Sequence, residues 1–567
     1  MERSQAPGIP GIQLQLLTPA LFPKLAAEPK GVVYTKPWVV DLLLNLAGYT
    51  SGKNLVDAVA IEPAAGNGAF FGPMVERLLG SCQRLGRPLS DCADSLVAFE
   101  LDEHSAGRAR ALAIETLLHR GAAPDLAESI VAKWVHAGDY LLEAVNRNAD
   151  FVIGNPPYVR LESIPEEASA MYRKAYHTMR GRADLYVAFF EAALTQLNDD
   201  GVCAFICADR WMRNQYGGDL RRLITSAFAV ETMIEMHDAG AFHDEVDAYP
   251  AITVIRRRKQ TSTVVASAGP ETEQADPDTV CSFLRAVNPT RTIAPVKGLK
   301  AARVSSWFCG SNPWPCHSPE QLALLRRLEE DFLPLEKHAR VGIGVATGND
   351  GVFVTRDPQL VEPSRVLKLA LARDICSGRM EWSGHYLIDP WDGHGLVNLA
   401  AYPRLRGYFE KHMEALKRRH TAERNLRGWY KTIDRVNHAL TLRPKLYVAD
   451  IKNTLNPVLD RGETYPHHNL YFVEADDWDL EVLGGLLLSS VGQFFVASYG
   501  VRMRGGYLRF QAQYLRRIRV PEPQSLSDNQ RALLKEAFRT RDRELATSLA
   551  LEVYRIGKAE LERALGS

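Results

Sequence analysis

The chain has 567 residues, 46% of them hydrophobic, and 68 Lys and Arg balance 68 Asp and Glu, so the formal net charge is zero. This length predicts two or three domains with sizeable cores, and the neutral total excludes a protein that binds nucleic acid through an overall basic charge. We find no secretory signal and no apolar run long enough to span a bilayer, so we expect a protein of the reducing cytosol that contacts no membrane.

The neutral total hides an uneven distribution of charge. Residues 1–300 carry a net charge of −6, and residues 301–567 carry +6. Basic residues gather between Arg404 and Lys445, with twelve Lys and Arg against four acids, and between Arg502 and Arg519, with six Arg and no acid. Such patches can still hold phosphate on a protein of neutral total charge.

The eight cysteines are scattered along the chain. Cys309 and Cys316-His317 could be metal ligands, but no second pair at zinc-finger spacing accompanies them. We therefore expect ordinary free thiols and no metal.

In chain order, residues 1–30 contain Pro and Leu without clear periodicity, and we expect an N-terminal arm. Thr35-Lys36-Pro37 then precedes apolar residues at helical spacing, which predicts a helix from about residue 37 to 46. Val56–Ile61 is a candidate strand, followed by a turn of small residues and a helix through Leu79. The turn, Glu62-Pro63-Ala64-Ala65-Gly66-Asn67-Gly68, lets a ligand approach the backbone but lacks the Gly-x-Gly-x-x-Gly of dinucleotide sites.

Two more strands follow, each with an acid near its end. Ser95–Glu100 ends in Glu100, whose carboxylate can accept both hydroxyls of a ribose, with Asp102 as the alternative. Ile130–Val135 is expected to be the third strand, before Gly138-Asp139.

The strongest signal is the stretch from Asp150 to Tyr158, in which an apolar run ends in Asn155-Pro156-Pro157-Tyr158. Two prolines cannot continue a sheet, so the chain leaves the strand as a stiff loop at the edge where open α/β sheets bind ligands. The Asn155 amide oxygen and the Pro156 carbonyl can draw the lone pair of an aromatic amine back onto its nitrogen, while Tyr158 stacks on the ring. Positioning and electrostatics would then perform the catalysis.

This corner resembles the amino-group methyltransferases, including the adenine-N6 DNA methyltransferases. The resemblance implies S-adenosylmethionine as cofactor and a Rossmann-like α/β sheet. In this family the glycine turn is followed by an acid that binds the ribose of the cofactor and by one that contacts its adenine amino group. Glu100 and Asp139 stand in these places, in the family's order before the corner. The cofactor-binding residues implied in this way are Thr35, Glu62, Ala64, Gly66, Gly68, Glu100, Asp139 and Asn155.

The sheet is expected to continue beyond the corner. A helix begins at Asp184, and later segments alternate between strand and helix patterns. We expect these elements at Gly201–Ile206 (strand), Trp211–Phe228 (helix), Val230–Met236 (strand) and Tyr249–Ile255 (last strand). In the loop before the last strand, Phe242 resembles the family's second aromatic wall for the target base, and Tyr249 is the nearest alternative.

The second half narrows the resemblance to TaqI-type, γ-class adenine-N6 DNA methyltransferases of restriction-modification systems. Val341–Phe353 is similar to their Gly-x-x-Thr-Gly-Asn-Asp-x-x-Phe element, and the likeness covers about Val32 to Pro521. It implies a catalytic domain at 31–260, a Ser/Thr/Glu/Asp/Pro-rich linker at 261–300, and a mixed α+β DNA target-recognition domain with C-terminal helices at 301–567.

Arginine mixed with glycine and aromatic residues near residue 505 suits DNA phosphates. The predicted DNA-binding residues are Arg502, Arg504, Arg509, Arg516 and Arg517. After about Leu526 the pattern indicates amphipathic helices, which pack on the chain itself or on a partner.

We therefore predict an enzyme that methylates N6 of an adenine flipped out of duplex DNA. A separate restriction endonuclease would complete the system, and a monomer is favoured. Two alternatives stay open: a methyltransferase for protein glutamine or RNA, and a DNA-binding subunit without activity. Because base contacts depend on loop geometry, the recognition sequence cannot be inferred from spacing.

Overall fold

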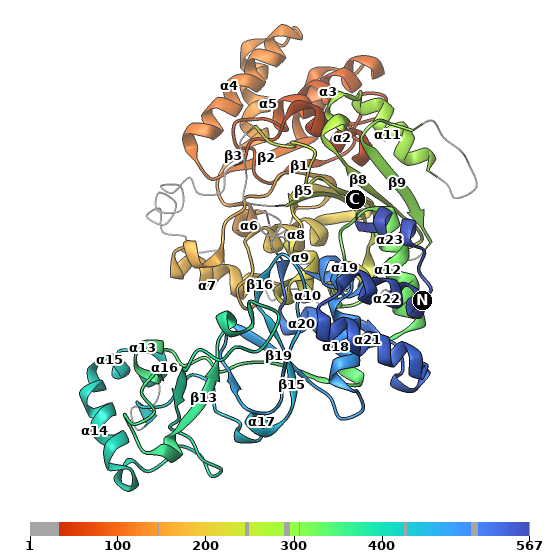
Figure 1. Ribbon diagram of the computed structural model, residues 1–567. Coiled ribbons are helices and arrows are strands. Elements are labelled where there is room, and N and C mark those ends of the chain that lie inside the picture. Colours follow the sequence, from red (N-terminus) through yellow and green to blue (C-terminus); the bar gives the residue numbers. More distant parts are fainter. Residues whose placement is uncertain are drawn as a thin grey trace, which may run out of the picture. The chain divides into compact units, whose positions relative to one another are not determined.

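The computed structural model describes residues 33–144, 147–243, 249–287, 295–305, 307–423, 428–500 and 508–565 (Figure 1). The chain divides into two compact units, Met1–Pro319 (unit 1) and Glu320–Ser567 (unit 2). The predicted N-terminal arm, together with Arg502 and Arg504, lies outside the described residues.

Unit 1 is built on a nine-stranded sheet in the order β3-β2-β1-β4-β5-β7-β6-β8-β9. Its strands are β1 (Ala60–Glu62), β2 (Leu96–Glu100), β3 (Val135–Ala137), β4 (Ala149–Gly154), β5 (Leu197–Ala208), β6 (Ala229–Glu235), β7 (Pro250–Arg256), β8 (Thr263–Ala268) and β9 (Leu299–Val304). The first five strands are mutually parallel, whereas β7 runs antiparallel between β5 and β6. The predicted Rossmann-like α/β fold is confirmed. The strand order reverses between β1 and β4, where sheets of this kind bind ligands at the carboxyl ends of the strands.

Helices cover both faces of this sheet. They are α2 (Pro37–Ala47), α3 (Phe71–Leu85), α4 (Glu103–His119), α5 (Pro124–Trp134), α6 (Tyr140–Glu143), α7 (Glu166–Ala175), α8 (Tyr186–Gln196), α9 (Arg210–Arg213), α10 (Gly218–Ala227) and α11 (Pro277–Ala286). Side chains alternate between the faces of a strand. In β5, Ala204 and Ile206 join the apolar cluster that contains α2, whereas Phe205 lies 5.1 Å from Phe190 of α8. The sheet is therefore held between two packed layers.

The expected third strand at Ile130–Val135 is wrong. Those residues complete helix α5, and β3 begins only at Val135. Pro124 occupies the first turn of α5, where a proline is well tolerated, and the buried Ala127, Ile130 and Val131 lie on one helical face. A short apolar run of this kind cannot be assigned to strand or helix without its neighbours.

The expected linker at 261–300 also differs from the structure. These residues form β8, α11 and the beginning of β9, and both strands extend the sheet. Strand β8 pairs in parallel with β6 and is mostly buried. The polar residues on either side of this short apolar segment made the whole stretch resemble a linker. Similarly, the expected helix at Trp211–Phe228 is broken after Arg213. The carbonyl oxygen of Trp211 would lie 1.8 Å from a Cβ at Gly217, so only glycine fits there.

The described residues of unit 2 form four small sheets and a helical layer. Its strands are β10 (Leu333–Pro334), β11 (Arg340–Ile343), β12 (Val354–Thr355), β13 (Val366–Ala370), β14 (Tyr386–Ile388), β15 (Lys445–Ala449), β16 (Ile451–Lys452), β17 (Val458–Asp460), β18 (Tyr465–Pro466), β19 (Leu470–Glu474), β20 (Leu508–Arg509) and β21 (Arg519–Val520). They pair as β11-β19-β15-β17, β12-β14-β13-β18, β10-β21 and β16-β20.

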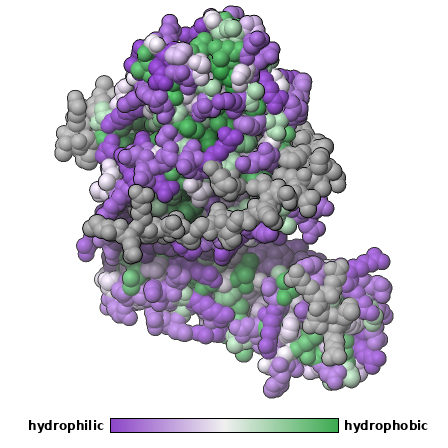
Figure 2. Space-filling view, turned by 180° about the vertical axis from the view of Figure 1, so that it is seen from behind, coloured by the Kyte–Doolittle hydropathy of each residue, from purple (hydrophilic) through white to green (hydrophobic). Residues whose placement is uncertain are grey.

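The helices of unit 2 are α12 (Pro319–Asp331), α13 (Asp350–Phe353), α14 (Pro403–Lys411), α15 (Met413–Lys417), α16 (His420–Glu423), α17 (His438–Leu442), α18 (Leu480–Leu488), α19 (Ser490–Tyr499), α20 (Ala512–Leu515), α21 (Asp528–Thr540), α22 (Arg543–Tyr554) and α23 (Lys558–Leu565). The predicted amphipathic C-terminal helices are confirmed, because α21 and α22 pack on α18 of the same unit. Among the described residues, no single helix is long and apolar enough to cross a membrane, and only α18 with α19, bent by 69°, passes as a pair. On the face seen in Figure 2, hydrophilic residues dominate and hydrophobic residues gather in small patches.

Candidate active site

The corner after β4 holds an amide whose oxygen has no hydrogen-bond partner. Asn155 donates through Nδ2 to the Val33 carbonyl oxygen (3.0 Å) and to Oγ1 of Thr35 (3.1 Å). A carbonyl can only accept, so the Asn155 nitrogen must face Val33. The opposite atom, Oδ1, is buried without a partner among the described residues. An acceptor left in this state is costly, and it is available to a ligand.

Both ends of the corner are tied to other elements. Behind it, Gly154 leaves space for the Pro63 ring, which would lie 3.3 Å from a Cβ at that position. Ahead of it, the Val159 carbonyl accepts a hydrogen bond from the Leu185 backbone at the start of α8 (2.9 Å). The stiff loop predicted from the two prolines is thus fixed on either side.

The segment before α2 links the corner to the loop after β6. Thr35 forms an isolated antiparallel bridge with Phe242, and the backbone of Lys36 donates to the Ala241 carbonyl (3.0 Å). The bridge holds the backbone of Phe242 beside Thr35, which Asn155 also contacts.

Tyr158 lies among aromatic side chains. Its ring centroid is 6.1 Å from that of Phe242 and 6.3 Å from that of Tyr186, with interplanar angles of 75° and 81°. The alternative wall residue, Tyr249, instead packs against His237, with ring centroids 4.7 Å apart and an interplanar angle of 55°. A base held between two aromatic faces needs those faces parallel, so stacking on both Tyr158 and Phe242 requires one ring to turn.

The glycine turn after β1 presents a second unsatisfied group. Glu62 is only 1% exposed, and its Oε2 is buried without a partner among the described residues. Burial, and then the neighbouring Glu100, raise the pKa of Glu62 well above its usual value. Gly66 and Gly68 adopt φ angles of +54° and +88°, which only glycine reaches without strain. Ala64, between them and Glu62, is half-buried.

The two other predicted acids follow β2 and β3. Glu100 accepts hydrogen bonds from the backbone of Gly66 (2.7 Å) and of Asp102 (2.9 Å), so it closes onto the glycine turn. The alternative, Asp102, caps α4 through Ser105 (2.8 Å). Asp139 accepts from the Tyr172 hydroxyl (2.5 Å), and burial raises the pKa of Asp139 to about 6.

These predicted side chains share one edge of the sheet. Glu62 ends β1 and Glu100 ends β2, while Asp139 lies two residues after β3 and Asn155 directly follows β4. Because the four strands are parallel neighbours, their carboxyl ends lie side by side around the β1/β4 switch. The edge offers a carboxylate for a positive charge, one for hydroxyls, and a buried amide oxygen for an amino group. A ligand with a cationic end and a ribose, placed beside a second molecule with an aromatic amine, fits this donor and acceptor set.

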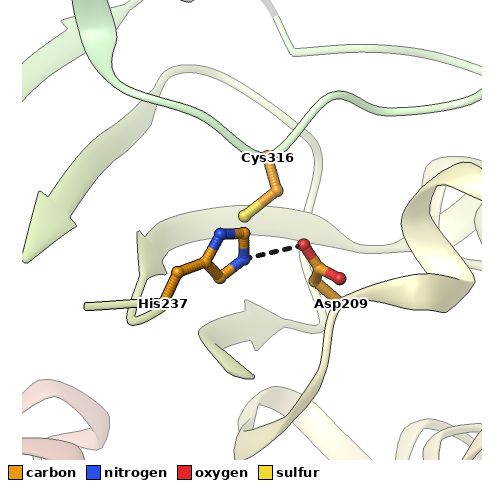
Figure 3. A group of neighbouring side chains, drawn as sticks. All are labelled: Asp209, His237 and Cys316. Atoms are coloured by element: carbon orange, nitrogen blue, oxygen red, sulfur yellow. Dashed lines mark hydrogen bonds and ion pairs between the residues drawn. The ribbon is translucent and has the colours of Figure 1, made fainter. Parts of the chain in front are cut away.

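Sequence reasoning missed a buried ionic cluster at the ends of β5 and β6 (Figure 3). Nε2 of His237 lies 3.0 Å from Asp209, and Nδ1 lies 2.8 Å from Glu235. Although burial lowers it, these two carboxylates raise the pKa of His237 to about 9. Both ring nitrogens therefore carry protons at neutral pH. Arg213 pairs with Asp209, so two cations balance two carboxylates.

The cluster also explains one of the noted cysteines. Cys316, buried beside Asp209 and His237, is a free thiol, as are the other seven cysteines. Asp209 directly follows β5, and His237 lies two residues after the end of β6. Polar residues just past the ends of two apolar strands were the available sequence signal. The cluster fixes the start of the loop that carries Phe242.

In unit 2, the described arginines of the predicted DNA-binding run bond to protein groups. Arg509 pairs with Asp450 (2.7 Å), and Arg516 donates to the Val341 carbonyl (2.8 Å). Arg517 pairs with Glu329 (3.3 Å) and lies 4.0 Å from the centre of the Tyr499 ring. Their contacts with DNA stay a prediction.

Comparison with known proteins identifies the family of this chain. A family model described as Eco57I restriction-modification methylase matches residues 115–242. Over 557 residues the chain is 43% identical to the Type II methyltransferase M.PaeR7I of Pseudomonas aeruginosa, covering 97% of this chain and 96% of that protein. It is 40% identical over 552 residues to the Type II methyltransferase M.BstVI of Geobacillus stearothermophilus, covering 94% and 97%. Among solved structures, the Type IIL restriction-modification enzyme MmeI in complex with DNA has a TM-score of 0.53 at 13% identity, covering 94% of this chain and 74% of that one.

Proposed function

Because the chain belongs to the Type II methyltransferases of restriction-modification systems, we propose that unit 1 methylates the N6 amino group of an adenine in duplex DNA. The observation that carries this proposal is the buried, unpartnered Oδ1 of Asn155. An aromatic amine needs an acceptor for its hydrogens before its nitrogen can attack, and Asn155 keeps one free.

S-adenosylmethionine would supply an electrophilic methyl group on a sulfonium centre. The residues that would hold it are Glu62 for the ammonium group, Glu100 for the ribose hydroxyls and Asp139 for the adenine amino group. The unpaired oxygen of Glu62 and the positive φ angles of Gly66 and Gly68 support this fit, since they give a buried carboxyl group, which can lose its proton to meet the ammonium charge, beside backbone open to close approach.

The chain's own residues would act on the target base by position. The Asn155 oxygen and the Pro156 carbonyl each accept a hydrogen bond from the amino group, and the target base stacks on the face of Tyr158. Burial raises the pKa of Tyr158, so it stays a neutral phenol. The proton of the attacking nitrogen leaves after transfer, and no covalent enzyme intermediate is required.

We further propose that unit 2 recognises the DNA sequence, that a separate endonuclease cuts the same unmodified sequence, and that the enzyme works in the cytoplasm as a monomer. The target base would leave the helix, because its amino group is paired inside the duplex.

The decisive experiment is methylation of duplex DNA by the purified protein, followed by digestion to nucleosides and mass spectrometry. We expect N6-methyladenine, and at least about a hundredfold less of it from Asn155→Ala at equal, early reaction times. If the product is N4-methylcytosine, the target is the exocyclic amine of cytosine instead of adenine, since the same acceptors suit both bases. Methylation of RNA or of protein glutamine, with DNA unmodified, would support the alternative substrate classes instead.

A further inference from the structure

Three side chains that play no part in the proposed methyl transfer come together in unit 2. Asp350, His467 and His468 each offer one metal-binding atom, and these atoms lie within 4.8 Å of one another. Nε2 of His467 is 3.1 Å from Oδ2 of Asp350, and the two imidazole centroids are 4.0 Å apart. Asp350 is 117 residues from His467, so the fold alone creates the group.

The backbone around the group is held by hydrogen bonds. Strand β11 pairs with β19, and beyond it the Val345 backbone donates to the Pro466 carbonyl (2.9 Å). In return, the His468 backbone donates to the Val345 carbonyl (3.0 Å). Gly344 makes this approach possible, because a Cβ there would lie 2.2 Å from the His467 carbonyl oxygen. The histidines therefore sit on a fixed scaffold.

The acid is oriented in the same way. The Thr347 hydroxyl donates to Oδ1 of Asp350 (2.5 Å), which leaves Oδ2 directed at His467.

His467 also contains an unsatisfied atom. The residue is 4% exposed, and its Nδ1 is buried without a hydrogen-bond partner among the described residues. His237 of unit 1 differs, because carboxylates hold both of its nitrogens. Both ring nitrogens of His237 thus already have partners, whereas Nδ1 of His467 has none among the described residues.

We propose that Asp350, His467 and His468 form a binding site for a divalent transition-metal ion, with zinc as the best match. Two imidazoles and one carboxylate form a ligand set that suits zinc. Ligands about 2.0 Å from a tetrahedral zinc lie about 3.3 Å apart, close to the separation of Asp350 and His467. Side chains of Asp350 and His468 are exposed, so solvent reaches the site and supplies the remaining coordination. The ion links the Val345–Asp350 segment to the turn before β19.

The test uses untagged, full-length protein freed of metal by a chelator. Isothermal titration with zinc should give one strong site per chain, and cobalt(II) at that site should produce visible d–d absorption. His468→Gln and Asp350→Asn each remove one ligand at an exposed position and should weaken zinc binding at least about tenfold. Zinc should raise the melting temperature of the wild type and leave that of these variants nearly unchanged.

Three controls keep the result specific. His394→Ala removes an exposed histidine of unit 2 outside the group and should bind zinc like the wild type. His237→Gln and Cys316→Ser test the cluster in unit 1 and should also leave zinc binding intact. The proposal is overturned if the wild type binds no zinc, if His468→Gln and Asp350→Asn bind as well as the wild type, or if only the unit 1 variants lose the ion. None of these outcomes depends on methyl transfer, so the proposed function stands or falls separately.

Discussion

The corner after β4 and the arginine run near the end of unit 2 are both rich in polar groups, yet only the arginines meet groups of opposite charge. At the corner, Asn155 Oδ1 and Glu62 Oε2 are buried without partners among the described residues. In the arginine run, Arg509 and Arg517 each pair with an acid of their own unit, while Nε of Arg509 and Nη1 of Arg517 are buried without a partner among the described residues. Unsatisfied buried groups are costly, so each one needs an explanation such as a ligand, an ordered water or strain. A charge that folding already pairs is less available to a binding partner than a group left without one.

The largest effect is expected at the corner itself. Asn155→Ala removes the free acceptor and should slow methyl transfer about 10²- to 10³-fold, the usual cost of one oriented polar contact in a transition state. Affinity for the cofactor should change only a few-fold. Single-turnover transfer of a radiolabelled methyl group measures the first quantity, and equilibrium binding measures the second.

Asn198→Ala is the matched control, because Asn198 is a half-buried amide that bonds to Asp150 outside the site. It should retain nearly normal turnover. Turnover close to wild type in Asn155→Ala would remove the catalytic role and, with it, the contrast between the two regions.

Glu62 allows the same contrast to be tested by pH. Its pKa is raised by burial and by Glu100, so the free protein holds a proton that a cationic ligand must displace. Cofactor affinity should therefore rise with pH, by about tenfold per unit while Glu62 is still protonated, and level off above the raised pKa. Titration calorimetry in buffers of different ionisation enthalpy would show the released proton. Glu62→Gln should bind weakly and without this pH dependence; an identical pH profile in the variant would mean that Glu62 does not meet the ligand's charge.

Phe242 tests how far the site extends beyond the corner. A second aromatic surface for an extruded base is worth about 1–3 kcal/mol, so Phe242→Ala should lower methylation of paired DNA about ten- to hundredfold. Phe242→Trp should retain much of the activity. A target adenine opposite a mismatch is cheaper to extrude and should be partly rescued. Equal losses on paired and mismatched targets would leave Phe242 as a packing residue beside Tyr158.

The smallest effect on DNA binding is expected from Arg517. Its pairing with Glu329 and its contact with Tyr499 predict that Arg517→Ala lowers the free energy of unfolding by about 1–3 kcal/mol. The salt dependence of DNA affinity should stay unchanged. If the slope of log affinity against log salt concentration falls by about 0.9 in the variant, Arg517 does contact a DNA phosphate. The variant in which Arg502, Arg504 and Arg509 are neutralised is the comparison, since the predicted phosphate contacts there should lower the slope.

Local sequence predicted unit 1 well because its key signals are short. An apolar strand followed by Asn155-Pro156-Pro157-Tyr158, and a strand followed by the Glu62–Gly68 turn, each define a strand end and a loop within a few residues. Errors arose where the local pattern was ambiguous. Ile130 and Val131 suit a helix or a strand equally, and only the capping at Pro124 and the packing of α5 separated them.

By itself, the sequence determined the α/β fold, the Asn155–Tyr158 corner at the end of a strand and the order of the acids along the sheet edge, because each depends on residues close together in the chain. Tertiary structure decided which of these groups remain unpaired. Whether Arg517 meets Glu329, or Asp350 meets His467, depends on contacts between segments more than a hundred residues apart. Such pairing follows from how the strands and loops pack, and neither spacing nor composition encodes it.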